Sequence, residues 1–304
     1  MGHAHPQVNE RIAEQLARGT PTLGILTDIA EIVVLVEPND LAELEATIGA
    51  RDDRIAAAIL EPTGSIYGQV PLRPEFVRRL RALTQAKGIV LIFDEVVTGS
   101  RVAPGGAQQV LGIRPDLTTL AKILAGGLPG GAVVDRRDLP ELLDPVKAQI
   151  AKFEKIGHQG TFNANPLSAA AGIATLELLK NGQAIARAHA FAEKVRSGAK
   201  AIFMDEDVPW GSYGASTGFF LNPNKLPIYA ETFDPIAMSA MDLRVPRNGS
   251  LTVKFRLAMR LNGVDLSAGP GGPCSAAHDD ADPDRTLTAV QASILALRQW
   301  REID

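Results

Sequence analysis

The sequence predicts an α/β fold in which a mainly parallel sheet carries helices on both faces and a smaller C-terminal α/β domain follows. Two apolar runs, residues 55–60 and 89–93, are continuous rather than alternating with polar residues, as in strands buried on both faces. Between them, residues 74–88 have the periodicity of an amphipathic helix. A strand, a helix and a strand in this order predict a parallel pair joined by a crossover. Functional groups in such sheets lie at the carboxyl ends of the strands.

The composition is that of an ordinary globular protein. Of the 304 residues, 45% are hydrophobic and 22% are charged, and the formal net charge is -4; these values exclude a collagen-like or disordered chain and predict no nucleic-acid partner. The apolar runs are too short to span a bilayer, and the first residues lack the cationic and apolar regions of a signal peptide. We therefore expect a cytoplasmic protein, with no membrane partner, that acts on a small molecule.

Cysteine and histidine usage predicts neither disulfides nor metal. The single cysteine, Cys274, excludes an intrachain disulfide, and the five histidines show no metal-ligand spacing. We expect no metal site.

The first elements have recognisable start and stop signals. Residues 5–19 form a predicted helix that ends at a glycine, and the β-branched apolar run 32–36 predicts a strand. Asp40, with Glu43 three positions later, resembles a capping box that opens the next helix.

The later elements continue this alternation. A further segment, residues 117–123, precedes a cluster of glycines, and residues 132–134 form a short apolar run. Asn165 and Pro166 suit the start of a helix, a second helix reaches about residue 203, and a last helix opens at Asp282. We expect three parts: an N-terminal helix with its connection over residues 1–30, a large domain over 31–204 and a small C-terminal domain over 205–304.

Two residues stand out as candidates for chemistry. Asp94 directly follows a buried strand, where a carboxylate is costly unless a cation faces it. Lys122 lies among apolar residues and glycines, and such a lysine can act as an amine nucleophile towards a carbonyl. Together they match what pyridoxal 5'-phosphate (PLP) needs, a lysine for the Schiff base and an acid on the ring nitrogen. Taken singly, the acid is as consistent with a turn or a magnesium site, and the lysine with a solvated loop.

Three segments carry a family resemblance. LIFDEVVTGSR (91–101), LAKILAGGLPGGAVV (120–134) and HQGTFNANPLSAAAGIATLELL (158–179), in this order, resemble the class III aminotransferases of fold type I, and most closely the glutamate-1-semialdehyde 2,1-aminomutase branch. Segments 2–20 and 256–287 resemble the same family. The resemblance implies a PLP-binding fold type I large domain with a smaller C-terminal domain.

The resemblance also implies roles for individual residues. Asp94 would pair with the pyridine nitrogen, Val96 would pack on one face of the ring, and Lys122 would form the Schiff base and shuttle a proton. Thr161 would donate to the cofactor phosphate of a neighbouring subunit, which implies a homodimer. Glu61 aligns with an acid near the substrate pocket, although a purely structural role is as probable. The implied substrate is a small amino acid or amine.

Other candidates have weaker support. We expect His278 not to be catalytic. Tyr67 and Ser100 are candidates for lining a pocket, with packing or loop surface as the alternative.

One part of the family pattern is absent. Between residues 19 and 32 the sequence lacks the stretch that supplies the family's phosphate-binding Ser-Gly-Thr loop and the aromatic residue that stacks on the ring. From the resemblance we also expect the family's N-terminal segment before Met1 to be missing. We expect that no other small-residue triplet of this chain, Asn248-Gly249-Ser250 included, leads into a helix that could replace the loop.

Two functions therefore stay open at this point. One is PLP-dependent amino-group transfer, by an aminotransferase or an aminomutase, through Lys122; another PLP reaction, such as racemisation or decarboxylation, would use the same residues. The alternative is a catalytically impaired or inactive truncated homologue that acts as a dimerising or structural remnant.

Overall fold

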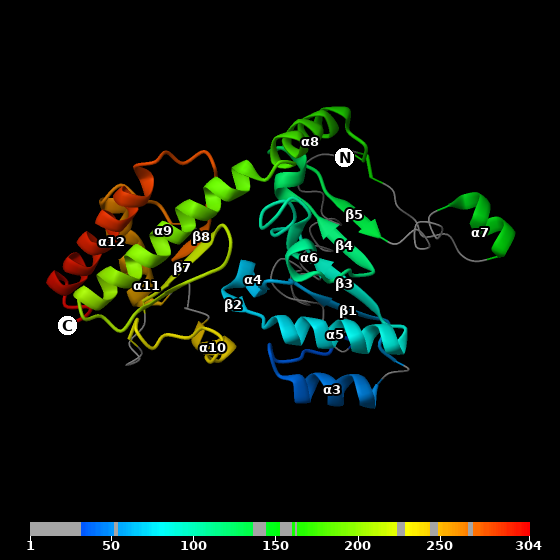
Figure 1. The fold of residues 1–304 in the computed structure, drawn as a ribbon, viewed down its shortest axis with the longest axis horizontal. Coiled ribbons are helices and arrows are strands. Elements are labelled where there is room, and N and C mark those ends of the chain that lie inside the picture. Colours follow the sequence, from blue (N-terminus) through cyan, green and yellow to red (C-terminus); the bar gives the residue numbers. More distant parts are fainter. Residues whose placement is uncertain are drawn as a thin grey trace, which may run out of the picture. The chain divides into compact units, whose positions relative to one another are not determined.

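The computed structural model describes residues 32–51, 54–135, 144–152, 160–161, 163–223, 229–243, 249–266 and 270–304. The chain divides into two compact units, Met1–Glu37 and Pro38–Asp304, and every element below belongs to the second (Figure 1). The helix expected over residues 5–19 lies outside the described residues. Residues 32–36 do not form a strand, so this expectation is wrong: β-branched residues favour a strand, but a strand also needs a partner for its backbone groups.

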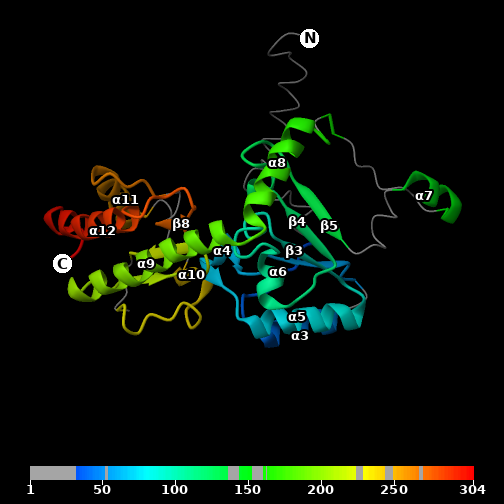
Figure 2. The same ribbon diagram turned by 45° about the horizontal axis from the view of Figure 1, so that its top comes forward.

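The larger sheet, which we call the N-terminal sheet, has four strands in the order β1-β3-β4-β5 (Figure 2). β1 (Ala57–Leu60), β3 (Val90–Asp94) and β4 (Leu117–Leu120) run parallel, and β5 (Ala132–Asp135) runs antiparallel to β4. The predicted α/β fold with a parallel-rich sheet is therefore confirmed.

Burial differs between the two strands that were expected to be fully covered. In β3, Leu91 and Phe93 are fully buried. In β1 the pattern alternates, and Ile59 is 65% exposed. β1 is an edge strand of this sheet, so the expectation of two covered faces is wrong for β1.

The helices beside β1 and β3 begin and end where their sequence signals predict. α3 (Leu41–Ala50) starts at Asp40, whose side chain accepts a hydrogen bond from the Glu43 backbone N–H at 2.8 Å. α5 (Pro74–Lys87) has its proline in the first turn and ends at Gly88, which has a left-handed φ of 69°. α3 packs on α5, and α5 packs on β3 (Figure 1).

The segment after β4 turns sharply onto a helix. β4 leads into the short 3-10 helix η1 (Lys122–Ala125) and then into β5. α8 (Pro166–Leu179), capped by the Asn165 side chain, packs against η1. Among the described residues, this part also contains α4 (Ser65–Gly68), α6 (Gly106–Leu111) and α7 (Pro145–Ala151).

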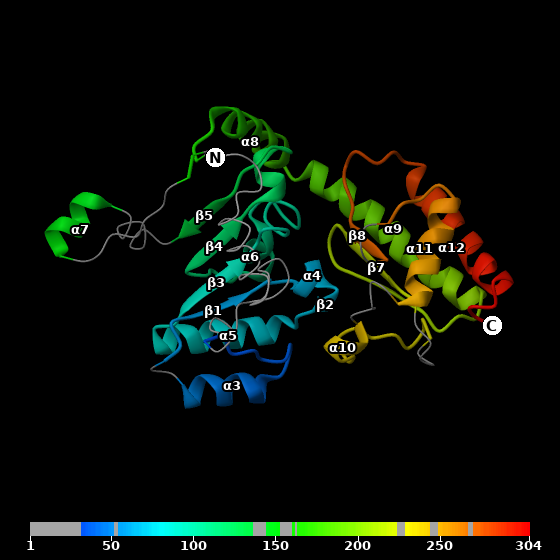
Figure 3. The ribbon, with the colours of Figure 1, turned by 180° about the vertical axis from the view of Figure 1, so that it is seen from behind.

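A second sheet, which we call the C-terminal sheet, is antiparallel and has the order β6-β7-β8. Its strands are β6 (Gly211–Tyr213), β7 (Gly218–Asn222) and β8 (Gly271–Pro273). The helices of this part are α9 (Gln183–Asp205), α10 (Ala240–Leu243), α11 (Ser250–Leu261) and α12 (Asp282–Gln299). α9 packs on β6 and β7, and α12 packs on α9 and α11 (Figure 3).

Aromatic side chains fill the core of this second part. Trp210 makes edge-to-face contacts with Phe203 and Phe255, and all three are fully buried. Because Phe203 comes from α9, that helix belongs to the same core. The division at residue 205 stays a prediction.

α11 corrects one expectation. Gly249 is the residue before this helix and Ser250 is its first residue, so a small-residue triplet does lead into a helix. Among the described residues, no helix combines the length and the apolar character that a membrane crossing requires.

Candidate active site

The parallel strands bring three predicted residues to one edge of the N-terminal sheet. Asp94 is the last residue of β3, and its partner in register is Thr119 of β4. Lys122 follows the end of β4, and Glu61 follows the end of β1. Carboxyl ends of neighbouring parallel strands meet in this way in α/β folds.

Asp94 has one anchored oxygen and one free oxygen. Its Oδ1 accepts hydrogen bonds from the Val96 backbone N–H at 3.1 Å and from the Thr119 hydroxyl at 3.2 Å. Within the described part of the chain, no hydrogen bond or ion pair reaches Oδ2. The half-buried carboxylate is therefore fixed in orientation and keeps one oxygen for a cationic N–H donor.

The neighbouring acid, Glu95, has a structural role. Its side chain is 1% exposed, and it accepts from the Thr98 hydroxyl at 3.0 Å and from the backbone N–H groups of Ala107 at 2.6 Å and Gln108 at 3.1 Å. These two N–H groups belong to the first turn of α6, where a helix has unpaired donors. The two consecutive acids therefore have different roles. Glu95 binds the first turn of α6, whereas Asp94 lies at the edge of the sheet.

Lys122 is exposed and has a left-handed backbone φ of 52°. This conformation costs about 1 kcal/mol or more for a non-glycine residue and is concentrated at functional sites. Lys122 has no ion pair with any described residue. Its amine is therefore available to a ligand.

The glycines after Lys122 allow close packing on α8. Gly126 has a φ of 62°, and a Cβ there would lie 2.7 Å from the Ala171 carbonyl oxygen. A Cβ on Gly172 of α8 would lie 2.8 Å from the Leu124 carbonyl oxygen. Glycine on both sides lets the backbone of η1 touch α8, and this contact fixes the segment that carries Lys122.

Glu61 is the titratable group with the clearest perturbation at this edge. Burial raises the pKa of Glu61 to about 6, and the Asp94 carboxylate adds to this rise. Hydrogen bonds from the backbone N–H groups of Tyr67, at 2.6 Å, and Ile66 oppose the rise, as does the charge of Lys122. Glu61 therefore lies within electrostatic reach of both Asp94 and Lys122.

The remaining predicted site residues lie in different surroundings. Val96 is half-buried, and Thr161 is exposed and precedes α8. The Ser100 hydroxyl donates to the Pro104 carbonyl at 3.2 Å, whereas Tyr67 is buried against Thr217. The structure brings Asp94, Lys122, Glu61 and Val96 to one edge, and the roles of these four residues and of Thr161 stay predictions.

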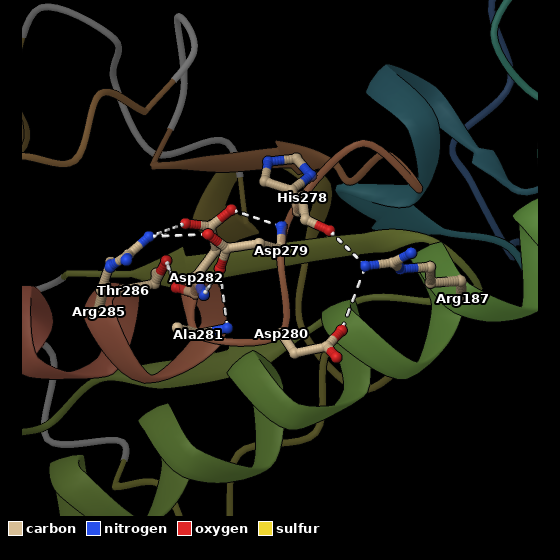
Figure 4. A network of polar contacts seen from close by, with 8 residues as sticks. All are labelled: Arg187, His278, Asp279, Asp280, Ala281, Asp282, Arg285 and Thr286. Atoms are coloured by element: carbon tan, nitrogen blue, oxygen red, sulfur yellow. Dashed lines mark hydrogen bonds and ion pairs between the residues drawn. The ribbon is translucent and has the colours of Figure 1, made fainter.

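His278 lies in the turn before α12 (Figure 4). Its Nδ1 is 3.2 Å from the Ser275 backbone nitrogen, and its ring contacts Phe191 with centroids 4.5 Å apart. Its carbonyl accepts from Arg187 at 3.1 Å, and Arg187 also pairs with Asp280 (Figure 4). These contacts favour the expectation that His278 is not catalytic.

The acidic residues around His278 organise the start of α12 (Figure 4). Asp279 Oδ1 accepts from the backbone N–H groups of Ala281 at 2.8 Å and Asp282 at 2.9 Å, and Asp282 Oδ2 accepts from the Asp279 N–H at 2.8 Å. The Ala281 N–H and the neighbouring Arg285 guanidinium lower the pKa of Asp279. These reciprocal hydrogen bonds fix the turn that leads into α12.

Sequence reasoning missed Thr119, which orients Asp94. The only signal was its place in the strand before Lys122, because the two strands must be paired in register before Thr119 meets Asp94.

Comparison with known proteins identifies the fold. An omega-transaminase from Sphaerobacter thermophilus superposes with a TM-score of 0.77 and 29% identity, covering 92% of this chain and 61% of that protein. A transaminase with PLP bound superposes with a TM-score of 0.74 and 26% identity, covering 89% of this chain and 59% of that protein. A glutamate-1-semialdehyde-aminomutase from Pseudomonas aeruginosa superposes with a TM-score of 0.71 and 25% identity, covering 87% of this chain and 56% of that protein. The chain thus spans 56–61% of the length of these three proteins.

The family is established from the sequence match. The aminotransferase class-III family matches residues 35–209, which include Glu61, Asp94, Lys122 and Thr161. This match covers more than half of the 304 residues. The chain therefore belongs to the class-III aminotransferase family.

Proposed function

We propose that this chain is a PLP-dependent enzyme of amino-group transfer, an aminotransferase or an aminomutase of the glutamate-1-semialdehyde type, that uses Lys122. The observation that carries the proposal is the placement of Asp94 and Lys122 at the carboxyl ends of the adjacent parallel strands β3 and β4. Family membership and the similarity to a transaminase with PLP bound support it.

The described residues fit the ring of this cofactor. Asp94 Oδ2 accepts no hydrogen bond within the described residues, whereas Oδ1 is fixed by Thr119 and the Val96 N–H. The free oxygen suits a protonated pyridine nitrogen, because a charge-assisted hydrogen bond stabilises both partners. When bound, PLP supplies a ring that withdraws electrons from the substrate α-carbon.

Each residue at the edge has a distinct task in this proposal. Asp94 would hold the protonated ring nitrogen, and the Thr119 hydroxyl, which donates to Asp94 Oδ1, would keep the carboxylate in a fixed orientation. The Lys122 amine would hold the cofactor through a covalent link and would move a proton at the substrate α-carbon. Val96 would pack beside the ring, and Glu61, whose pKa is raised by burial to about 6, is mostly ionised at pH 7 and gains its proton as the pH falls towards 6.

The phosphate site and the partner are part of the same proposal. Thr161 is exposed before the N-terminus of α8, which suits a donor to the phosphate of a second subunit. The active unit is then a homodimer, and the substrate is a small amino acid or amine.

A second candidate function is a non-catalytic homologue that associates through α8. The supporting observation is the apolar surface of this helix, on which Leu167, Ile173 and Leu178 are 67%, 63% and 73% exposed. Exposed apolar side chains clustered on one element are typical of association surfaces.

The test is product analysis with matched lysine variants. The full chain with PLP is incubated with amino acids and amines, with and without a keto-acid acceptor, and the products are identified by mass spectrometry. We expect conversion that Lys122→Ala abolishes and that Lys200→Ala, at another exposed lysine, retains. Conversion of glutamate-1-semialdehyde without an acceptor distinguishes the aminomutase.

The same samples separate the two candidates. A chain that associates in sedimentation equilibrium but neither retains PLP nor forms any product would favour the non-catalytic homologue.

A further inference from the structure

We propose that Tyr67 is a positioning residue: its hydroxyl, docked on Thr217 beside the C-terminal sheet, fixes the turn whose backbone N–H groups hold the Glu61 carboxylate. The importance of Glu61 for catalysis rests on the proposed function. The coupling itself is a property of this chain and is measurable without cofactor.

The turn that contacts Glu61 has an unusual backbone. In α4 (Ser65–Gly68), Ile66 and Tyr67 have left-handed φ values of 55° and 60°. Such values are disfavoured for side-chain-bearing residues, and most strongly for a β-branched one, so the surrounding structure must maintain them. This conformation lets the Tyr67 N–H donate to Glu61 Oε1 at 2.6 Å.

The Tyr67 side chain is a long-range restraint on this turn, in addition to the local β-bridges Gly64–Pro71 and Ser65–Val70. It is 6% exposed, and its hydroxyl is hydrogen-bonded to the Thr217 hydroxyl. Its ring lies directly on the backbone of Gly218, where a Cβ would come within 2.6 Å of the ring carbon Cε1. The Tyr67 ring therefore occupies space that any side chain at position 218 would fill, and only glycine leaves this space open.

Thr217 is itself held in place from both sides. The buried Arg196 guanidinium donates to the Ser216 carbonyl at 3.2 Å and to the Gly218 carbonyl. The Cys274 N–H donates to the Thr217 carbonyl at 2.6 Å. The residues that contact the Tyr67 side chain are therefore held by α9 and the C-terminal sheet, whereas Glu61 follows a strand of the N-terminal sheet.

Side-chain packing does not hold the α4 turn on every side. A cavity of about 480 Å³ borders it, lined by Thr63 and Gly68 on one side and by Arg196 and Ser212 on the other. The hydroxyl of Thr63 is buried without a hydrogen-bond partner in the described residues. The hydrogen bonds made by Tyr67 therefore add a restraint that packing does not supply at this flank.

The consequence is a link between two parts of the fold. The amides of Ile66 and Tyr67 lower the pKa of Glu61 against the effect of burial. If Thr217 and Gly218 move, Tyr67 moves with them, these two hydrogen bonds weaken and the pKa of Glu61 rises. The position of the C-terminal sheet thereby sets the proton occupancy of an acid beside Lys122.

The experiment compares Tyr67→Phe, Thr217→Val and the double variant with the wild-type full chain, without cofactor. Tyr213→Phe is the matched control, because Tyr213 lies in the same buried cluster as Tyr67 and its hydroxyl donates to the Gln69 carbonyl at 2.8 Å, but within the described residues it makes no hydrogen bond to residue 66 or 67. The readouts are amide hydrogen exchange at residues 66–68 and the titration midpoint of Glu61, assigned with Glu61→Gln by carboxylate NMR.

We expect roughly five- to tenfold faster exchange of the Tyr67 amide in each single variant, as for the loss of one buried hydrogen bond. We also expect an upward shift of the Glu61 midpoint from about 6, no further change in the double variant, and an unchanged midpoint in Tyr213→Phe.

An unchanged Glu61 midpoint in folded Tyr67→Phe would overturn the proposal. So would equal shifts in Tyr213→Phe, since these would indicate general loosening. Either result leaves the test of Lys122 untouched, so failure of this proposal is distinguishable from failure of the proposed function.

Discussion

The Thr119 hydroxyl donates a hydrogen bond to Asp94 Oδ1 across the β3–β4 pair, at 3.2 Å. The two residues are partners in register, 25 positions apart in the chain. This bond and the Val96 N–H occupy the same carboxylate oxygen, so the second oxygen is presented in a fixed direction. A rigid carboxylate binds a cationic N–H group without first losing its own freedom of rotation.

Thr119→Val tests this orientation. The variant removes one hydrogen bond to a charged group, and we expect PLP affinity to fall about tenfold, in line with about 1.5 kcal/mol for such a bond. Equilibrium dialysis measures the change. Thr118→Val, in the same strand but without contact to Asp94, serves as the control and should bind as the wild type does.

Glu95→Ala tests the division of labour between the two acids. The buried Glu95 accepts hydrogen bonds from Thr98 and from the first turn of α6, so its loss should lower the free energy of unfolding by about 2–4 kcal/mol. Asp94→Ala should cost less, because Asp94 is only half-buried and accepts two hydrogen bonds. Urea unfolding of both variants decides; a larger loss in Asp94→Ala would contradict the assignment.

Glu61→Gln tests the raised pKa of Glu61. Burial raises this pKa from its ordinary value of 4.5 to about 6, so between these values the folded chain keeps a proton that the unfolded chain releases. The free energy of unfolding therefore falls as the pH rises through this window, and the contribution is fully present below pH 4.5. Relative to the wild type, Glu61→Gln should gain stability from pH 4.5 to 7 in urea unfolding. A difference that does not vary with pH would refute the assignment.

Gly126→Ala tests the contact between η1 and α8. Gly126 and Gly127 both have positive φ, but a Cβ on Gly126 would meet Ala171 and Thr175 at 2.7 Å, whereas a Cβ on Gly127 meets nothing within 4 Å. Both alanine variants carry backbone strain of about 1 kcal/mol, and only Gly126→Ala adds a clash. We expect a thermal midpoint several degrees lower for Gly126→Ala than for Gly127→Ala. Equal midpoints would contradict the packing described for Lys122.

Local signals predicted the elements whose boundaries depend on neighbouring residues. Pro74 and Gly88 define α5, and Asp40 caps α3. The prediction failed at residues 32–36, because strand formation depends on a partner that composition does not reveal.

Only part of the candidate site could be predicted from the sequence. The meeting of Asp94, Lys122 and Glu61 at one edge was predictable because each lies at or just beyond the end of a strand, and parallel strands align these ends; their roles stay predictions. The structural role of Glu95 and the docking of Tyr67 on Thr217, 150 residues away, depend on long-range packing. Neither has a signal in local periodicity.

The most direct test of the central claim is the location of the covalent cofactor link. The full chain is equilibrated with PLP and reduced with borohydride, and the modified peptide is identified by mass spectrometry beside Lys122→Ala and Lys200→Ala. We predict one adduct per chain on Lys122, retained in Lys200→Ala and lost in Lys122→Ala. No adduct, or labelling spread over several lysines in all three proteins, would contradict the proposal that Asp94 and Lys122 form a PLP site.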